Sequence, residues 1–209
     1  MKGILCFGDS ITFGMGCNGG WVGRLKKYFE FIGNHNGVYN LGINGNTTTD
    51  LLKRFEVEAS SRIRVKRPAD DYMIIIAIGI NDSKSEGGFE NLVTDSLLFE
   101  KNIKKLVNES KKFTKNVVFV GLTPVDEKLA CPYENSYFTN DKIKEYNEVI
   151  RKVCVNDESV NGGVRFLDIY ESLNELDFLK CLSDGLHPDS KGHDMMFEII
   201  RNGLGDFLD

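Results

Sequence analysis

The feature that most constrains this fold is residues 71–80, DYMIIIAIGI, the most hydrophobic run in the chain. A strand with one face in water alternates apolar and polar residues, whereas a strand covered on both faces is apolar almost throughout. The run is also far shorter than a membrane-spanning helix. It therefore predicts a central strand of a parallel sheet that has helices on both sides.

Further apolar segments and amphipathic helical patterns alternate along the chain around this run. The other predicted strands are residues 4–7, 37–43, 116–123 and 164–169. Helical spacing of apolar residues runs from Trp21 to Ile32, from Leu51, from Leu92 to Phe113, from Ile143 to Val153 and from Met196 to Phe207. Residues 125–138 are expected to be an irregular loop. Strands that alternate with helices predict an α/β fold with a parallel sheet between two helical layers.

Length and charge narrow the class of protein. A chain of 209 residues is the size of one domain, and no repeat or linker divides it, so we expect a single domain over residues 1–209. A net charge of −5 argues against nucleic-acid binding, which needs a basic face. No apolar run has the length of a membrane helix, so no integral membrane association is expected. The oligomeric state is left open.

Cysteine usage and the first residues bear on the compartment. The five cysteines are scattered and contain no Cys-x-x-Cys pair, which indicates neither a zinc site nor a disulfide framework. One Lys and four apolar residues precede Asp9, and this pattern is not that of a signal peptide. A reducing cytoplasm is therefore the expected compartment.

The informative polar residues come directly after predicted strands. Ser10 follows the first strand, Gly45 the second and Asn81 the third, whereas Asp184 and His187 come after the last. Open α/β folds bind ligands at this carboxyl edge of the sheet. Acyl transfer needs a nucleophile, a general base, a group that orients the base, and donors for the developing oxyanion. These five residues can fill all four roles.

The segment around His187 suits a catalytic base. Pro188 disfavours a helical conformation at the residue before it. A three-residue turn can then bring the Asp184 carboxylate to His187 Nδ1 and leave Nε2 free to face Ser10. The turn therefore predicts a base that is already oriented for the serine.

Each of these residues also has a simpler explanation. Ser10 is suited to cap a helix or to bind a phosphate at a helix N-terminus. Asp184 and His187 could belong to a surface turn, and Asn81 could end a strand through local hydrogen bonds. His193 together with His187 and Asp184 could bind a metal, but their spacing fits no familiar metal motif. We favour the catalytic interpretation because the roles complement one another.

Four sequence blocks resemble the SGNH, or GDSL-type, hydrolase family. They are Gly8-Asp9-Ser10, Asn40-Leu41-Gly42-Ile43-Asn44-Gly45, Gly79-Ile80-Asn81-Asp82 and Asp184-Gly185-Leu186-His187. All four stand in the family's order and together span nearly the whole chain. Ile11 stands where the family's first block continues with Leu, which is a conservative change.

The resemblance implies a flavodoxin-like three-layer α/β/α sandwich with about five parallel strands, and a serine esterase site without cofactor or metal. Ser10 would be the nucleophile, His187 the general base and Asp184 the orienting carboxylate. The oxyanion hole would consist of the Ser10 and Gly45 backbone N–H groups and the Asn81 side-chain amide.

The second block offers two glycines as oxyanion donors. Gly45 is preferred over Gly42 because it directly precedes Asn46-Thr47. Glycine at that position lets the backbone approach a substrate closely. The amide of Asn81 can then add a further N–H without adding charge.

The function expected from these features is cleavage of small or medium-sized carboxylic esters through an acyl-enzyme intermediate. The expected partner is a small-molecule ester, and lysophospholipase-like, thioesterase and carbohydrate O-acetylesterase activities remain open. Discrimination should lie in the loops at residues 14–20, 83–89 and 125–138, and whether the last is a lid is left open. Three aromatic residues of that loop suggest an apolar pocket: Tyr133, Tyr137 and Phe138. The alternative function is a non-catalytic module that binds a small anion or nucleotide.

Overall fold

Five parallel strands form the central sheet of the computed structural model, which describes residues 2–33, 35–63, 70–157 and 163–208. In spatial order they are β2 (Gly37–Gly42), β1 (Lys2–Gly8), β3 (Asp71–Ala77), β5 (Asn116–Val120) and β7 (Arg165–Leu167). This order reverses direction between β1 and β3, as in flavodoxin-like folds. The predicted α/β fold with a five-stranded parallel sheet is confirmed.

The most hydrophobic run of the sequence forms the middle strand. β3 pairs with β1 along its whole length and with β5 on its other side. Every side chain from Tyr72 to Ile76 is buried, as expected for a strand that helices cover on both faces. The prediction of a strand over 71–80 was wrong at its end. Gly79 has φ +132, which ends the extended backbone, and the short helix α4 (Ile80–Ser83) begins directly after it.

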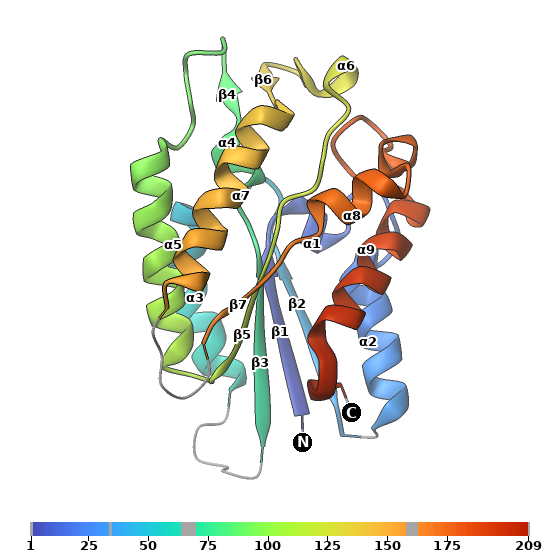
Figure 1. The fold of residues 1–209 in the computed structure, drawn as a ribbon. Coiled ribbons are helices and arrows are strands. Elements are labelled where there is room, and N and C mark those ends of the chain that lie inside the picture. Colours follow the sequence, from blue (N-terminus) through green and yellow to red (C-terminus); the bar gives the residue numbers. More distant parts are fainter. Residues whose placement is uncertain (1, 34, 64–69, 158–162, 209) are drawn as a thin grey trace.

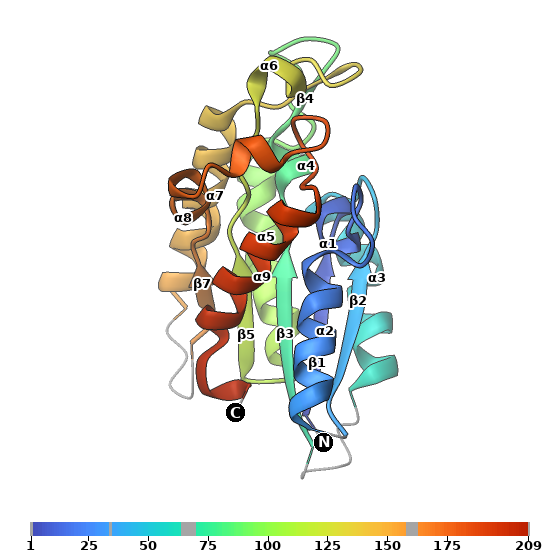
Figure 2. The ribbon, with the colours of Figure 1, turned by 90° about the vertical axis from the view of Figure 1, so that its right-hand side faces the viewer.

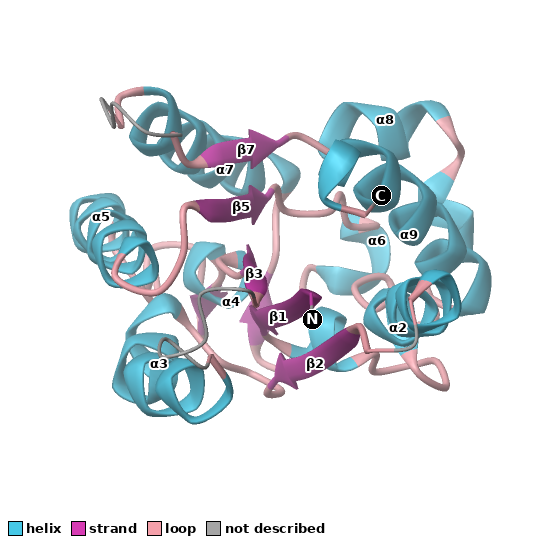
Figure 3. Ribbon diagram, turned by 90° about the horizontal axis from the view of Figure 1, so that it is seen from below, coloured by secondary structure: helices cyan, strands magenta, loops and turns pink. Residues whose placement is uncertain are grey.

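Helices cover both faces of the sheet (Figure 3). One face carries α3 (Thr48–Arg62), α5 (Ser96–Lys111) and α7 (Asn140–Val155), and the other carries α2 (Gly20–Ile32), α8 (Tyr170–Glu175) and α9 (Ser190–Leu204). Thr47 and Asp50 form a capping box at the start of α3. Asp95 caps α5, so the predicted helix from Leu92 to Phe113 was too long at both ends.

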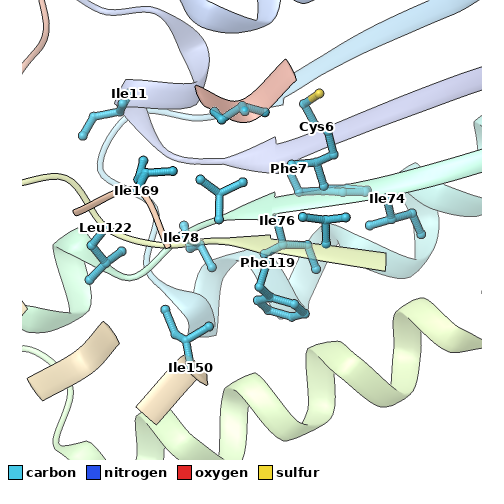
Figure 4. Close-up of a cluster of buried hydrophobic side chains, with 14 of the residues drawn as sticks. Cys6, Phe7, Ile11, Ile74, Ile76, Ile78, Phe119, Leu122, Ile150 and Ile169 are labelled. Atoms are coloured by element: carbon cyan, nitrogen blue, oxygen red, sulfur yellow. The ribbon is translucent and has the colours of Figure 1, made fainter. Parts of the chain in front are cut away.

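The core fills the space between the sheet and the helical layers. One connected cluster of buried apolar side chains joins the strands to helices of both faces. Figure 4 shows part of it, with labelled side chains from β1, β3, β5 and α7: Cys6, Phe7, Ile74, Ile76, Phe119 and Ile150. Truncating such an isoleucine to Ala typically costs about 2–5 kcal/mol of stability. This closely packed core supports the sheet beneath the loops at its ends.

Short elements gather above the carboxyl ends of the strands, and the two chain ends lie at the opposite end of the molecule (Figure 1, Figure 2). These elements are α1 (Ser10–Phe13), α4, β4 (Ser85–Glu86), α6 (Glu127–Ala130), β6 (Ser136–Tyr137) and the 3-10 helix η1 (Phe178–Cys181); a second 3-10 helix, η2 (Gly205–Phe207), follows α9. Residues 125–138 are not the irregular loop predicted, because they contain α6 and β6. β6 pairs antiparallel with β4, a partner far away in the sequence that gives no local signal.

Three further observations bear on the sequence-based expectations. None of the helices in the described part of the chain has both the length and the apolar character that a membrane crossing needs. All five cysteines lie among the described residues and carry free thiols. His35, in the connection before β2, is exposed.

Candidate active site

Ser10 stands at the sharp turn between β1 and α1. Asp9 caps α1, because its carboxylate accepts a hydrogen bond from the Ile11 backbone N–H at 3.0 Å. The alternative in which Ser10 itself caps the helix is therefore wrong, and Ser10 is the first helical residue. Its Oγ lies 3.0 Å from His187 Nε2, which comes from the far end of the sequence.

His187 and Asp184 belong to one tightly bonded turn. Asp184 Oδ2 lies 2.7 Å from His187 Nδ1. The other oxygen, Oδ1, accepts hydrogen bonds from the backbone N–H groups of Leu186 at 3.0 Å and of His187 at 2.7 Å. The Ser183 hydroxyl and backbone N–H both donate to the His187 carbonyl. These bonds fix the imidazole between the carboxylate and Ser10.

The electrostatics of this turn favour an ionised carboxylate. Burial alone would raise the pKa of Asp184, but hydrogen bonds from His187 and Leu186 outweigh burial and lower that pKa below its ordinary value. The Asp184 side chain is 31% exposed, whereas that of His187 is only 6% exposed. An ionised Asp184 favours the imidazole tautomer with its proton on Nδ1, which leaves the lone pair of Nε2 facing Ser10.

Of the two glycines in the second block, Gly45 is the one that shares a cavity with Ser10. Gly45 has φ +75, and a Cβ built on it meets no atom within 4 Å, so it borders open space. Gly42 packs against α1 instead, because a Cβ there would lie 2.2 Å from the Phe13 backbone nitrogen. Gly45 rather than Gly42 is therefore the glycine that a bound molecule can reach.

Asn81 lies in α4, directly after the end of β3. Its side-chain Nδ2 donates a hydrogen bond to the Asn46 carbonyl at 3.1 Å, which ties two of the strand-end loops together. The same amide has a second hydrogen for another acceptor. The next residue, Asp82, is structural: its carboxylate accepts hydrogen bonds from the Thr48 backbone N–H at 2.9 Å and hydroxyl at 2.6 Å.

A cavity of about 240 Å³ opens over these residues. It is lined by Ser10, Met15, Asn44, Gly45, Asn81, Lys84, Tyr133, Glu134, Ser136, Phe138, Leu186 and His187. The lining draws on all three loops that the sequence singled out, at residues 14–20, 83–89 and 125–138. Sequence reasoning named Tyr133 and Phe138 but missed Lys84 and Glu134, because no motif marks them. Tyr137, which it also named, does not line this cavity and packs on Phe89, with 4.7 Å between the ring centroids.

Two other buried titratable groups lie close to the site. Asp9 is buried, and burial together with the charge of Asp82 raises its pKa to about 7. Burial lowers the pKa of His193 to about 4, and His193 Nδ1 accepts a hydrogen bond from the Trp21 backbone N–H at 3.2 Å. His193 therefore joins α9 to α2. Within the described ranges, no three His, Cys, Asp or Glu side chains are grouped so that they could hold a metal ion.

Comparison with protein families and curated proteins gives two matches. The family described as GDSL-like Lipase/Acylhydrolase matches residues 6–195. A multidomain esterase from Ruminococcus flavefaciens is 26% identical over 223 aligned positions, which cover 92% of this chain and 27% of that esterase. The chain thus spans about a quarter of the length of this curated relative.

Solved structures resemble the chain over almost its full length. A lipase/acylhydrolase from Enterococcus faecalis has a TM-score of 0.76 at 23% identity, covering 98% of this chain and 96% of its own. A member of the lipolytic G-D-S-L family from Veillonella parvula has a TM-score of 0.72 at 20% identity, covering 97% of each chain. A variant of an acetyl xylan esterase from Geobacillus stearothermophilus has a TM-score of 0.71 at 22% identity, covering 97% of this chain and 94% of its own. At these identities the likeness shows a shared fold.

Proposed function

Because this chain belongs to the GDSL-like lipase/acylhydrolase family and is therefore an esterase or acylhydrolase, we propose that it hydrolyses small or medium-sized carboxylic esters with Ser10 as nucleophile. The observation that carries the proposal is the line of contacts from Ser10 Oγ to His187 Nε2 at 3.0 Å and from His187 Nδ1 to Asp184 Oδ2 at 2.7 Å. Membership of an esterase family sets aside the alternative of a non-catalytic binding module.

In the first half of the reaction, His187 Nε2 takes the hydroxyl proton of Ser10 while Oγ attacks the ester carbonyl carbon. The carbonyl oxygen becomes an oxyanion. As the tetrahedral intermediate collapses, the bond to the leaving oxygen breaks, and His187 gives its proton to that oxygen. An alcohol leaves, and Ser10 carries the acyl group. The ionised Asp184 stabilises the imidazolium that exists between these steps.

In the second half, water takes the place of the alcohol. His187 Nε2 accepts a proton from the water as its oxygen attacks the acyl carbon, and the second oxyanion collapses with release of Ser10 Oγ. His187 returns the proton to Ser10, and the free acid leaves. No cofactor enters either half of this proposed cycle.

The oxyanion would be stabilised by the backbone N–H groups of Ser10 and Gly45 and by the Asn81 amide. Ser10 supports this role because it begins α1, where backbone N–H groups have no partner within the helix. Gly45 supports it through the open space beside it, and Asn81 through its second amide hydrogen. Donors of this kind act strongly because they are already oriented before charge develops.

The size and lining of the cavity support a short acyl group. Pockets for drug-sized ligands have about 300–1,000 Å³, and this cavity has about 240 Å³. Its polar lining residues, such as Asn44, Lys84 and Ser136, favour a leaving group that can form hydrogen bonds. Carbohydrate O-acetylesterase activity is therefore the first to test, with thioesterase and lysophospholipase-like activities as the other arms of the same panel.

The test of the proposal is ester hydrolysis by a Ser10→Ala variant. With p-nitrophenyl acetate as substrate, we expect kcat to fall by at least about 10⁴-fold, because no other nucleophile replaces the hydroxyl. Ser60→Ala, on the exposed side of α3, is the matched control and should keep full activity. Hydrolysis by Ser10→Ala at the rate of the parent protein would overturn the proposal.

We also propose that residues 1–209 act as one catalytic domain. The connected hydrophobic cluster of the described residues, which joins the sheet to the helices of both faces, and the family match over residues 6–195 support this. Activity in the cytoplasm stays a prediction from the sequence, with which the free thiols of all five cysteines agree.

A further inference from the structure

The segment of residues 125–138 is attached to the Asp184–His187 turn near its beginning. The Asp126 backbone N–H donates a hydrogen bond to the Gly185 carbonyl at 2.9 Å. Gly185 has φ +87 and lies so close to α6 that a Cβ there would be 2.5 Å from Leu129 Cβ. This end of the segment is therefore packed directly on the turn that carries the proposed base.

The far end of the segment is a tight hairpin that fixes Tyr133. The Tyr133 N–H donates to the Ser136 carbonyl at 2.7 Å, and the Ser136 N–H donates to the Tyr133 carbonyl at 2.9 Å. Glu134, at the turn between them, has φ +53, which is uncommon for a residue other than glycine. The hairpin is in turn paired with β4, and the Gly87 N–H donates to the Asn135 carbonyl at 2.9 Å. The hairpin therefore fixes the backbone position from which the Tyr133 side chain extends.

That position places Tyr133 against both members of the proposed Asp–His pair. Its ring lies with 6.0 Å between its centroid and that of the His187 imidazole, at an interplanar angle of 70°. Its hydroxyl interacts with the Asp184 carboxylate; burial and this carboxylate together raise the pKa of the phenol. Tyr133 also lines the cavity that contains Ser10. One side chain thus meets the base, its orienting carboxylate and the space for substrate.

The Asp184–His187 turn is partly open to water, and a side chain packed against it can exclude water from the pair. The Asp184 side chain is 31% exposed, and water that reaches a charged pair weakens the interaction within it. The other charged groups lining the cavity are Lys84 and Glu134. Lys84 Nζ is already paired with Glu86 at 2.8 Å, whereas the Tyr133 ring lies against the His187 imidazole.

We propose that Tyr133 is a positioning residue of this esterase, which holds Asp184 and His187 in their reactive arrangement and makes residues 125–138 a fixed support of the site rather than a lid. The inference rests on the proposed function, because it assigns Asp184 and His187 to the same reaction. The contacts at both ends of the segment carry it: Asp126 to Gly185, and Tyr133 to His187.

The experiment compares Tyr133→Phe and Tyr133→Ala with the matched variants Tyr137→Phe and Tyr137→Ala. Tyr137 is in the same hairpin but packs on Phe89 outside the cavity. With p-nitrophenyl acetate, we expect kcat to fall about tenfold in Tyr133→Phe and about 100-fold in Tyr133→Ala, with KM changed less than threefold. Both Tyr137 variants should keep the parent kcat.

The pH profile of kcat/KM separates positioning from simple structural support. The Tyr133 hydroxyl stabilises the Asp184 carboxylate, so the carboxylate attracts a protonated His187 less strongly. Its removal in Tyr133→Phe therefore favours the imidazolium, and the acidic limb of the profile should move to higher pH. Tyr137→Phe should leave the acidic limb in place. Melting temperatures measured alongside show that each variant is folded.

Two results would overturn the inference. The first is a Tyr133→Phe variant with the parent kcat and an unmoved acidic limb. The second is a Tyr133→Ala variant that changes KM alone, which would make Tyr133 only a wall of the substrate space. Ser10→Ala in the same assay distinguishes failure of this inference from failure of the proposed function. Only retained activity in Ser10→Ala would overturn the proposed function.

Discussion

The two sides of the cavity over Ser10 are built in different ways. The inner side consists of residues just after the ends of parallel strands together with the Asp184–His187 turn, which is fixed by local hydrogen bonds from the Leu186 and His187 backbone N–H groups to Asp184. The outer side consists of loop residues, such as Lys84 and Ser136, from the two segments that the pairing of β4 with β6 brings together. The inner side is suited to chemistry that requires exact placement, whereas the outer side, apart from Tyr133, can vary without disturbing the sheet.

The largest effect should come from the base on the inner side. We expect His187→Ala to lower kcat for p-nitrophenyl acetate by at least about 10⁴-fold, because the variant lacks the base that accepts the proton from Ser10 and then from water. The exposed His35→Ala is the control and should behave as the parent does. If His187→Ala lost less than tenfold, the inner side would not be the catalytic one.

The next effect in size concerns an oxyanion donor. Asn81→Ala should lower kcat by about 10²–10³-fold with little change in KM, because the interaction strengthens only as charge develops. Asn108→Ala, at an exposed position of α5, serves as the control. Steady-state kinetics on one short ester are sufficient. A rise in KM with kcat unchanged would assign Asn81 to ground-state binding instead.

A third prediction concerns the stability of the helices beneath the inner side. His193 has a pKa of about 4 in the folded protein, below the unfolded value of 6.5, so the unfolded chain binds the proton more readily. Neutral His193 therefore makes its full contribution to the free energy of unfolding above pH 6.5, and this contribution is lost as the pH falls from 6.5 towards 4. We expect the free energy of unfolding to decrease by up to about 3 kcal/mol over this range.

Urea unfolding measured at pH 7 and at pH 4.5 checks this prediction. His193→Asn cannot titrate, although its side-chain oxygen can still accept from the Trp21 N–H. It should show a smaller decrease in unfolding free energy between the two pH values than the parent. Equal decreases in both proteins would mean that groups other than His193 cause the pH dependence.

The smallest effect should come from Lys84, on the outer side. Lys84→Met keeps an unbranched apolar side chain of nearly the same length but removes the charge that pairs with Glu86 at 2.8 Å. Because partly exposed pairs contribute little, we expect kcat within about threefold of the parent and a KM changed by no more than about fivefold. A loss of kcat as large as that of Asn81→Ala would abolish the distinction between the two sides.

The inner side could be predicted from the sequence because its signals are local. Ser10 and Asn81 come directly after apolar runs that predict strands, and the three-residue spacing of Asp184 and His187 predicts their contact. The outer side could not, because the pairing of β4 with β6 joins residues that no local pattern relates. For the same reason Glu134 and Lys84 were missed, and Tyr137, although aromatic and in the expected loop, faces Phe89 instead of the cavity.

The errors in element boundaries also have physical causes. The run 71–80 is apolar to its end, but Ile78 and Ile80 are buried beyond the strand, so hydrophobicity continues where the extended backbone does not. Leu92 fits the helical spacing of the residues after it, yet the Asp95 cap sets the start of α5. The spacing of apolar residues indicates which positions are buried. In these two cases the end of the element is set by a capping residue, Asp95, or by a glycine with positive φ, Gly79.

Labelling with a fluorophosphonate tests the central claim most directly, because only an activated serine reacts with this probe. The account predicts one label per chain on the peptide that contains Ser10, no label on Ser10→Ala, and labelling of His187→Ala that is slower by several orders of magnitude. An unlabelled parent protein, or a label that Ser10→Ala takes up as fast as the parent, would contradict it.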